Sequence, residues 1–279
     1  MKTTTKNKKT PGAIAQSLTG RDYVSHTQIS TFQRCPLRWH FQYVERCAPE
    51  SVSVGLAIGR SIHAALEHHF RSLREGNGRP SLVELLEVFH ASWEDHAAVP
   101  ILFGRDTDRQ DVDRIARTLL QAFGQHPAAS VEGRMLGVEE PLRGRIVAGV
   151  PDLLARADLI VETGDGLLIR DFKTSRSRWT ESKCQSSAPQ LLLYGALAEV
   201  RFGAVANGRL RLEFVVLTKT RVPSVDTHVV EPDPVQWART KRVIARVWSA
   251  MIASHIYPNP TPLNCTTCPF HRRCKRWSG

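Results

Sequence analysis

The chain has 279 residues, 42% of them apolar, and a formal net charge of +11 with an isoelectric point near 9.8. This length and composition are ordinary for a soluble globular protein of one or two domains. The sequence has no run of about 18 uncharged apolar residues and no apolar signal segment at its N-terminus, so we expect a cytoplasmic protein without a membrane span. The positive charge favours nucleic acid as the partner.

The first half of the chain predicts a tail followed by helices. Residues 1–22 begin with a basic stretch and predict a loose, flexible tail. Residues 27–46 predict two short helices around Cys35 and Pro36, because proline suits the first turn of a helix. Apolar residues then recur at helical spacing in three segments, residues 59–75, 81–96 and 108–125.

From about residue 134 the pattern changes to strands. Residues 139–162 are rich in strand-forming residues, and a tight turn at residues 163–166 leads into a strand at 167–173. A helix at 188–201, a strand at 209–219 and a long helix at 233–256 follow. We expect a mixed α/β (α+β) fold, with a small mixed sheet flanked by helices in a single domain spanning residues 23–279. Within it we expect a helical part at about 55–130, a core at about 134–220 and a C-terminal helix and tail at about 233–279.

An acid and a base close the strand at 167–173. Asp171 and Lys173 are two residues apart, so in a strand they point to the same face while Phe172 points to the other. Such a pair is either a salt bridge at a strand end or half of a metal-dependent hydrolytic site. Asp152 lies 18 residues before Asp171, in the segment Gly149-Val150-Pro151-Asp152, and could end a neighbouring strand. Paired carboxylates are ligands that Mg²⁺ prefers.

Two helical pairs accompany these carboxylates. His63 follows Gly59 by four residues at the start of the first amphipathic helix, and Gln190 and Tyr194 share a face of the helix after the Asp171 strand. Taken alone, the histidine could be a surface or core residue, and the second pair could be an ordinary polar helix edge. The order of all four motifs along the chain is more specific than any one of them.

The ordered set G-x-x-x-H, G-x-P-D, D-x-K and Q-x-x-x-Y resembles the PD-(D/E)XK nuclease superfamily. It resembles in particular the RecB-like branch, which includes the RecB and AddB nuclease domains and the CRISPR-associated RecB-like exonucleases. The resemblance spans roughly residues 25–276 and implies a restriction-endonuclease-like core. Many members have glutamate where this chain has Asp171, an accepted variant.

The resemblance also implies the roles of the site residues. Mg²⁺ or Mn²⁺ would be held by His63, Asp152, Asp171 and the backbone carbonyl of Phe172. Lys173 would act on the attacking water and the phosphate. Gln190 and Tyr194 would help to place Lys173 and the DNA backbone.

Three of the six cysteines form the motif Cys265-x-x-Cys268-x₅-Cys274, a spacing that points to metal ligation. Iron–sulfur clusters and zinc both require four ligands. In the RecB-like branch, one cysteine before an N-terminal proline joins such a motif to hold a 4Fe–4S cluster, and Cys35 resembles that residue. A structural cluster joining the two chain ends is therefore implied. Zinc, with His271 as a substitute ligand, is the alternative, and Cys47 is a weaker alternative to Cys35.

Cationic residues cluster in sequence near the proposed site, together with Trp179. We expect them to contact phosphates and the tryptophan to stack on an unpaired base, although a solvated basic loop would have the same composition. The cationic residues are Arg170, Arg176, Arg178, Lys183, Lys219 and Arg221. No P-loop motif is present, so the chain cannot itself unwind a duplex by hydrolysing ATP.

The sequence thus predicts a metal-dependent DNA nuclease, an exonuclease on single-stranded or frayed ends. Recombination, repair and CRISPR adaptation are the expected settings, with a helicase or an adaptation complex as a partner. The alternatives are a partner-dependent endonuclease that trims DNA ends, a non-catalytic DNA-binding clamp, and a zinc-stapled interaction module.

Overall fold

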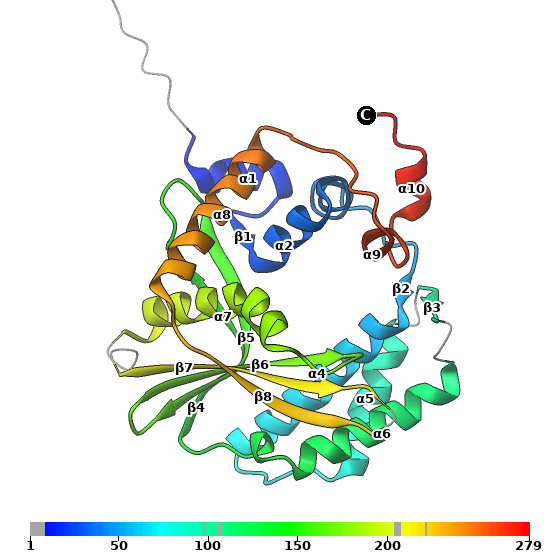
Figure 1. Cartoon of the computed structure of the whole chain (residues 1–279), viewed down its shortest axis with the longest axis vertical. Helices are drawn as coiled ribbons and strands as arrows, with labels where there is room; N and C mark the ends of the chain where they lie inside the picture. Colours follow the sequence, from blue (N-terminus) through cyan, green and yellow to red (C-terminus); the bar gives the residue numbers. More distant parts are fainter. Residues whose placement is uncertain (1–8, 97–98, 105–107, 204–207, 221) are drawn as a thin grey trace, which may run out of the picture.

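A computed structural model describes residues 9–96, 99–104, 108–203, 208–220 and 222–279 (Figure 1). Its centre is a six-stranded mixed sheet with helices packed on both faces, which confirms the predicted fold class. No helix in the described part of the chain is long and apolar enough to cross a membrane.

The long strand β5 organises the sheet. β4 pairs with it antiparallel along one edge, while the other edge pairs with β1 near its start and with β6 near its end. β6 continues into a parallel pair with β7, and β8 closes the sheet antiparallel to β7. The strands are β1 (Tyr23–Ser25), β4 (Arg134–Gly144), β5 (Asp152–Thr163), β6 (Gly166–Ser175), β7 (Arg209–Thr218) and β8 (Ser224–Val230).

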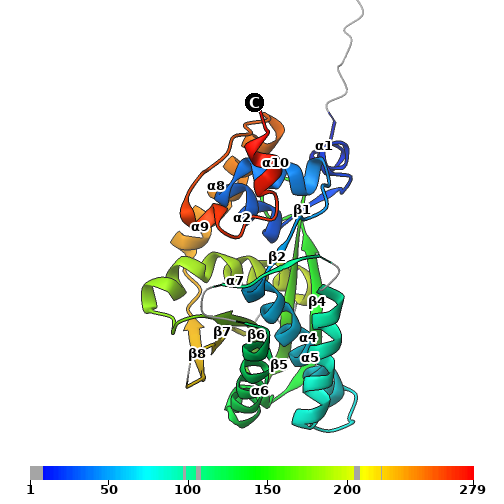
Figure 2. The ribbon, with the colours of Figure 1, turned by 90° about the vertical axis from the view of Figure 1, so that its right-hand side faces the viewer.

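Helices α4 (Val54–Arg74), α5 (Leu82–His96) and α6 (Arg109–Gln125) cover one face of the sheet (Figures 1 and 2). Ser53 caps α4 through its hydroxyl, and an Asp108–Asp111 capping box starts α6. Phe172 of β6 is buried here, stacked on Phe70 at 5.4 Å between ring centroids. This aromatic contact fixes β6 against α4, the helix that carries His63.

Helices α7 (Glu181–Phe202) and α8 (Pro234–Ile252) cover the opposite face (Figure 2). Their apolar residues, including Leu193, Ile244 and Trp248, pack with Phe214 of β7 in a second hydrophobic core. The sheet is therefore buried on both sides, and the continuous apolar run at the start of β6 follows from this.

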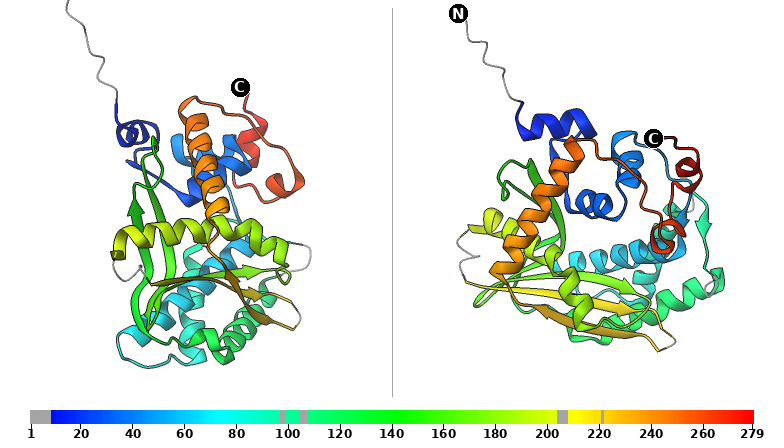
Figure 3. Two further views of the ribbon diagram at one scale, coloured as in Figure 1. Left: turned by 60° about the vertical axis from the view of Figure 1, so that its left-hand side comes forward. Right: turned by 45° about the horizontal axis from the view of Figure 1, so that its top comes forward.

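Residues 9–47 and 253–279 lie in the same region, above the sheet (Figure 3). Asn259 and Asn264 donate their side-chain amides to the carbonyl of Arg34, and the Leu37 N–H bonds the Tyr257 carbonyl at 3.1 Å. The elements of this part, with a small two-stranded sheet beside it, are α1 (Pro11–Thr19), α2 (His26–Arg34), α3 (Pro36–Trp39), the π-helix η1 (His40–Val44), β2 (Val52–Ser53), β3 (Ile101–Leu102), α9 (Pro262–Cys265) and α10 (His271–Lys275). A 3₁₀ turn, η2 (Pro127–Ala129), follows α6.

The expected flexible tail at residues 1–22 is wrong for its second half. Residues 11–19 form α1, with Thr10 as its N-cap, Pro11 in its first turn and Gly20 in the left-handed region at φ 72° after its last turn. Residues 1–8 lie outside the described residues. These capping signals are visible in the sequence, but the basic residues that precede them led to the prediction of a tail.

Two further elements differ from the prediction. β8 was missed because its pattern is mostly half-exposed and polar, as suits an edge strand. α7 starts at Glu181 rather than near residue 188, capped by Thr180, and it contains Pro189. A proline inside a helical segment normally marks a boundary, and here the helix continues through it.

Candidate active site

The D-x-K segment lies on β6 as its strand periodicity predicts. Asp171 and Lys173 share one face, with Lys173 Nζ 2.5 Å from Asp171 Oδ2, while Phe172 points into the opposite core. Asp171 is 2% exposed and Lys173 27% exposed at the side chain. The lysine therefore reaches the solvent-facing side of a carboxylate that is otherwise enclosed.

Helix α7 holds Asp171 from the other side. Gln190 donates its amide N–H groups to Asp171 Oδ1 at 2.9 Å and to the Tyr194 hydroxyl at 2.6 Å. The four-residue spacing places both side chains on the helix face that meets the sheet. The structure thus brings together Asp171, Lys173, Gln190 and Tyr194.

A second carboxylate, Asp158, lies in the fork where β5 and β6 separate. The paired register of the two strands ends at Leu159 and Arg170. Just beyond that point the Phe172 N–H donates to Asp158 Oδ2 at 2.6 Å. Asp158 therefore lies beside Asp171, with one oxygen held by the backbone of the D-x-K strand.

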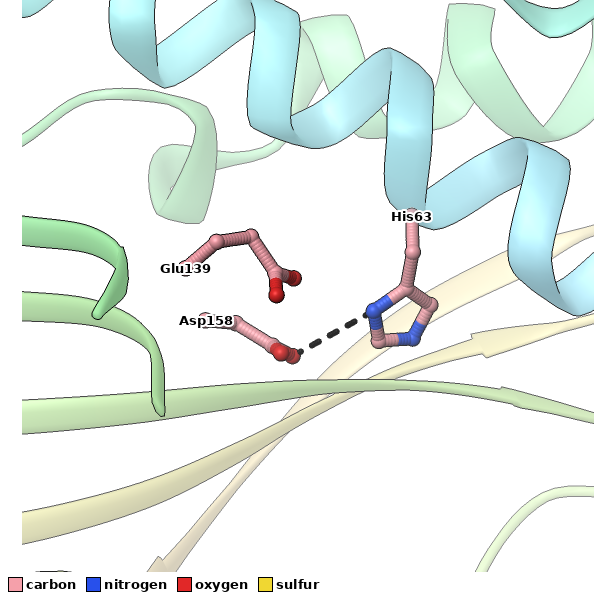
Figure 4. A group of neighbouring side chains, drawn as sticks. All are labelled: His63, Glu139 and Asp158. Carbon is pink, nitrogen blue, oxygen red and sulfur yellow. Dashed lines mark ion pairs between the residues drawn. The ribbon is translucent and has the colours of Figure 1, made fainter. Parts of the chain in front are cut away.

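His63 and Glu139 complete the cluster with Asp158 (Figure 4). His63 comes from α4, and its Nδ1 lies 3.5 Å from Asp158 Oδ2. One ligand atom from each of these three residues lies within 4.8 Å of the other two. The arrangement gathers a helix and two strands around one point.

Asp152, which the sequence analysis chose as the upstream carboxylate, lies elsewhere. It begins β5 and forms ion pairs with Arg143 at 3.0 Å and Arg145 at 3.6 Å. It is six residues before Asp158, which is about 20 Å along an extended strand. The structure does not bring it to the cluster, and Asp158 occupies the position expected for it.

The turn between the strands contains the signal that identifies Asp158. The turn pairs Thr163 with Gly166. Continuing that antiparallel register down the hairpin sets Asp158 opposite Asp171, whereas Asp152 would face Ser177. A strand-interior acid in an apolar run was therefore the better candidate than one beside a proline.

Glu139 had no comparable signal in the sequence. Its neighbours Val138 and Glu140 pair with Leu159 and Ala157, so Glu139 lies opposite Asp158 on β4. Its φ is +51°, a conformation that costs a non-glycine residue about 1 kcal/mol or more. Backbone strain of this kind is not readable from residue type.

The cluster concentrates negative charge in a buried place. Burial, together with the neighbouring Asp158, raises the pKa of Glu139 to about 7. Burial likewise raises the pKa of Asp171 to about 6, against the opposing effect of Lys173. Burial alone would lower the pKa of His63, but Asp158 and Asp171 outweigh it and raise the pKa to about 9. The site therefore favours a cation.

These residues fit a divalent metal ion. The donors are carboxylate oxygens and one imidazole, which suit Mg²⁺ and Mn²⁺. The side chains of Glu139 and Asp158 are only 16% and 12% exposed, so water stabilises their charges poorly. A bound ion would supply that stabilisation instead. A cleft of about 750 Å³ opens onto the cluster, and Arg60, Arg156 and Lys173 place positive charge along it. An anionic substrate could reach the metal there.

The comparisons with known proteins agree with this geometry. The PD-(D/E)XK nuclease superfamily matches residues 23–275, which is nearly the whole chain. The chain belongs to the PD-(D/E)XK nuclease superfamily. It is therefore a nuclease by family, a class that hydrolyses phosphodiester bonds.

The fold is supported by a solved structure. The crystal structure of a "Putative exonuclease" from Eubacterium rectale is similar with a TM-score of 0.59 and 13% identity, over 98% of this chain and 93% of that one. A second structure, of a protein called SSO0001, has a TM-score of 0.36 and 16% identity, over 89% and 94% of the two chains. No protein with a curated description matches the sequence.

The expected DNA contacts of this nuclease divide into two groups. Arg170 is buried, in an ion pair with Glu213 at 2.9 Å and bonded to the Ala128 carbonyl, so it is a core residue and not a DNA contact. Trp179 packs on Phe214 with 5.1 Å between ring centroids, so part of its ring is buried against the hydrophobic core. Arg176, Arg178 and Lys183 are exposed, Lys219 is half-buried, and Arg221 lies outside the described residues.

Four cysteines gather at the other end of the nuclease. Cys35, Cys265, Cys268 and Cys274 line one cavity, beside the buried Leu37, Phe41 and Phe270. Burial raises the pKa of the Cys268 and Cys274 thiols. Cys47 packs against the same apolar residues but does not line the cavity, and His271 does.

We predict that Asp158→Asn weakens Mn²⁺ binding about tenfold or more, because it removes a charged ligand from the cluster. Asp152→Asn is the matched control and should leave binding within about twofold, since Asp152 is occupied by two arginines. Isothermal titration of each purified variant with Mn²⁺ measures both. Loss of binding in Asp152→Asn with normal binding in Asp158→Asn would contradict the assignment.

Proposed function

We propose that this nuclease is a Mg²⁺- or Mn²⁺-dependent deoxyribonuclease whose metal ligands are His63, Asp158 and Asp171, with Glu139 beside them. The observation that carries the proposal is the convergence of these groups with Lys173 at the fork of β5 and β6. The Phe172 carbonyl, next to Asp171 on the same strand, is a further proposed ligand.

The chemistry requires positive charge where a phosphodiester gains negative charge during attack. A bound metal would supply this charge and lower the pKa of its water. Lys173 adds a cation on the exposed side of Asp171, within reach of the water and the phosphate. Gln190 orients Asp171 through its amide, and Tyr194 holds Gln190.

We further propose exonuclease action on single-stranded or frayed DNA. The reacting carboxylates are almost fully enclosed, with Asp171 2% exposed, so a flexible strand reaches them more easily than a rigid duplex. The similarly folded protein from Eubacterium rectale is itself named as an exonuclease. A RecB-like nuclease of this kind would receive its ends from a helicase or within CRISPR adaptation or repair.

A comparison of linear and circular DNA tests this proposal. With Mg²⁺ or Mn²⁺ we expect a linear single strand to be degraded, and a closed circle of the same sequence to survive, because it offers no end. EDTA should stop the degradation. Cutting of the circle at a similar rate would show endonuclease action instead.

The four cysteines are proposed to hold a 4Fe–4S cluster with a structural role. Arg38 lines the same cavity, and its Nε–H is buried without a hydrogen-bond partner. A sulfur-rich anionic group would accept from that donor, so the residues present fit such a cluster. It would join chain segments more than 200 residues apart, which already meet through Asn259, Asn264 and Glu50.

Sulfur spacing favours a cluster over zinc. A tetrahedral zinc ion with bonds of 2.3 Å holds its sulfurs about 3.8 Å apart. In the described part of the chain, the one group of three ligand atoms within 4.8 Å is His63, Glu139 and Asp158, and no three cysteine sulfurs form another. The cysteine sulfurs therefore lie farther apart than a single tetrahedral zinc ion would hold them, which supports the cluster over zinc.

We predict that Cys268→Ala removes the brown absorbance of the anaerobically purified protein and lowers its thermal midpoint, because one of four ligands is lost. Cys184→Ala, at a buried cysteine of α7 outside the cavity, is the control and should keep the chromophore. Ultraviolet–visible spectra and iron analysis measure the effect. A colourless wild-type protein that contains one equivalent of zinc would contradict the iron–sulfur assignment.

A further inference from the structure

A second groove adjoins the active-site cleft, between helices α2, α7 and α8. Its volume is about 600 Å³, and His26 lines both the cleft and the groove. The His26 ring lies edge-on to Tyr194, 6.4 Å between centroids. His26 therefore lies at the boundary between the groove and the cleft, beside Tyr194 of the site.

Gln190 connects the groove to the site. This residue lines the groove and also donates to Asp171 Oδ1. A chain lying in the groove would therefore contact a residue that is bonded to the D-x-K carboxylate. Gln33 and Arg34 of α2 and Arg239 of α8 line the same groove.

A proline inside helix α7 helps to hold the walls in place. Pro189 has no N–H to bond the Gln185 carbonyl one turn earlier in α7. The Gln236 side chain of α8 donates to that carbonyl instead, at 3.1 Å. The proline therefore creates a polar link between α7 and α8 along the groove, and the groove is present before any ligand binds.

The chemistry of the groove differs from that of the cleft. The cleft contains the acidic residues Glu67, Glu139 and Asp158. None of the residues that line the groove, all of them described in the structure, is acidic. Its polar groups are amides, hydroxyls and two guanidinium groups, namely Gln33, Gln185, Gln190, Gln236, Ser30, Ser186, Ser187, Thr240, Arg34 and Arg239.

We propose that this groove holds one unpaired DNA strand next to the scissile phosphate, with Arg34 and Arg239 on its phosphates. The proposal rests on the nuclease function above. Arginine, amide and hydroxyl groups are the usual partners of phosphate and sugar oxygens. Apart from His26, no aromatic ring lines the groove, so contact is to the backbone and is independent of sequence.

An unpaired strand fits better than a duplex. Helices α2, α7 and α8 wall the groove, and Gln190 in its lining is bonded to the enclosed carboxylate of Asp171. A strand held in a duplex could enter only after unpairing. Burial and the nearby Lys173 lower the pKa of His26 to about 4, so at neutral pH the junction between groove and cleft carries a neutral ring that does not trap the passing phosphate.

The experiment measures binding of fluorescein-labelled oligothymidylate by anisotropy, in EDTA and over a series of salt concentrations. Arg239→Gln should weaken binding about threefold to tenfold and lower the salt slope by about 0.7, the value for one lost contact to a single strand. Gln33→Trp, which fills the groove without changing charge, should weaken binding by a similar factor. Arg117→Gln removes the same charge from an exposed site on α6, across the sheet, and should bind like the wild type.

The outcomes separate this proposal from the nuclease function. Normal oligothymidylate binding by both groove variants would overturn the groove, even if the wild type cleaves DNA. Weakened binding would support it, even if the wild type proves inactive. Equal weakening on a blunt duplex would also overturn the proposal, because the groove would then not select an unpaired strand.

Discussion

The balance of charge at the fork of β5 and β6 governs this structure. Asp158, Asp171 and Glu139 meet there with little access to water, and three carboxylates so placed would repel one another strongly. His63 and Lys173 offset part of that charge, and the backbone N–H of Phe172 holds one oxygen. A divalent metal would complete the balance, so the same arrangement of carboxylates would serve catalysis.

The rest of the fold positions these groups from separate directions. Phe172 stacked on Phe70 fixes β6 to α4 and so sets His63 against Asp158. Gln190 links α7 to Asp171 from the opposite face of the sheet. The N-terminal helix α2 lines both the cleft and the groove. Its last residue, Arg34, also lines the cysteine cavity, together with residues of the C-terminal segment. A cluster there would act on the DNA path through α2 rather than on the reaction itself.

The sequence predicted the sheet and its flanking helices, because strand and helix periodicity reflect which faces are buried. Of the site residues that it named, His63, Lys173 and Tyr194 line the cleft, and Asp171 and Gln190 contact them through hydrogen bonds and an ion pair. It chose Asp152 because that residue ends the motif G-x-P-D, whereas the hairpin register sets Asp158 opposite Asp171. The positions of Glu139 and of the buried pair Arg170–Glu213 depend on tertiary contacts across strands. No local sequence pattern predicts them.

The most direct test follows single-stranded DNA labelled at either end, with wild type and Lys173→Met side by side in Mg²⁺ or Mn²⁺. We expect the wild type to shorten the DNA, and the variant to do so about 100-fold more slowly while binding DNA with similar affinity, since Lys173 acts mainly on the transition state. Equal cleavage by both proteins would contradict the assignment of Lys173. A wild type that binds metal and DNA without cleaving would contradict the active site as a whole and favour a DNA-binding clamp.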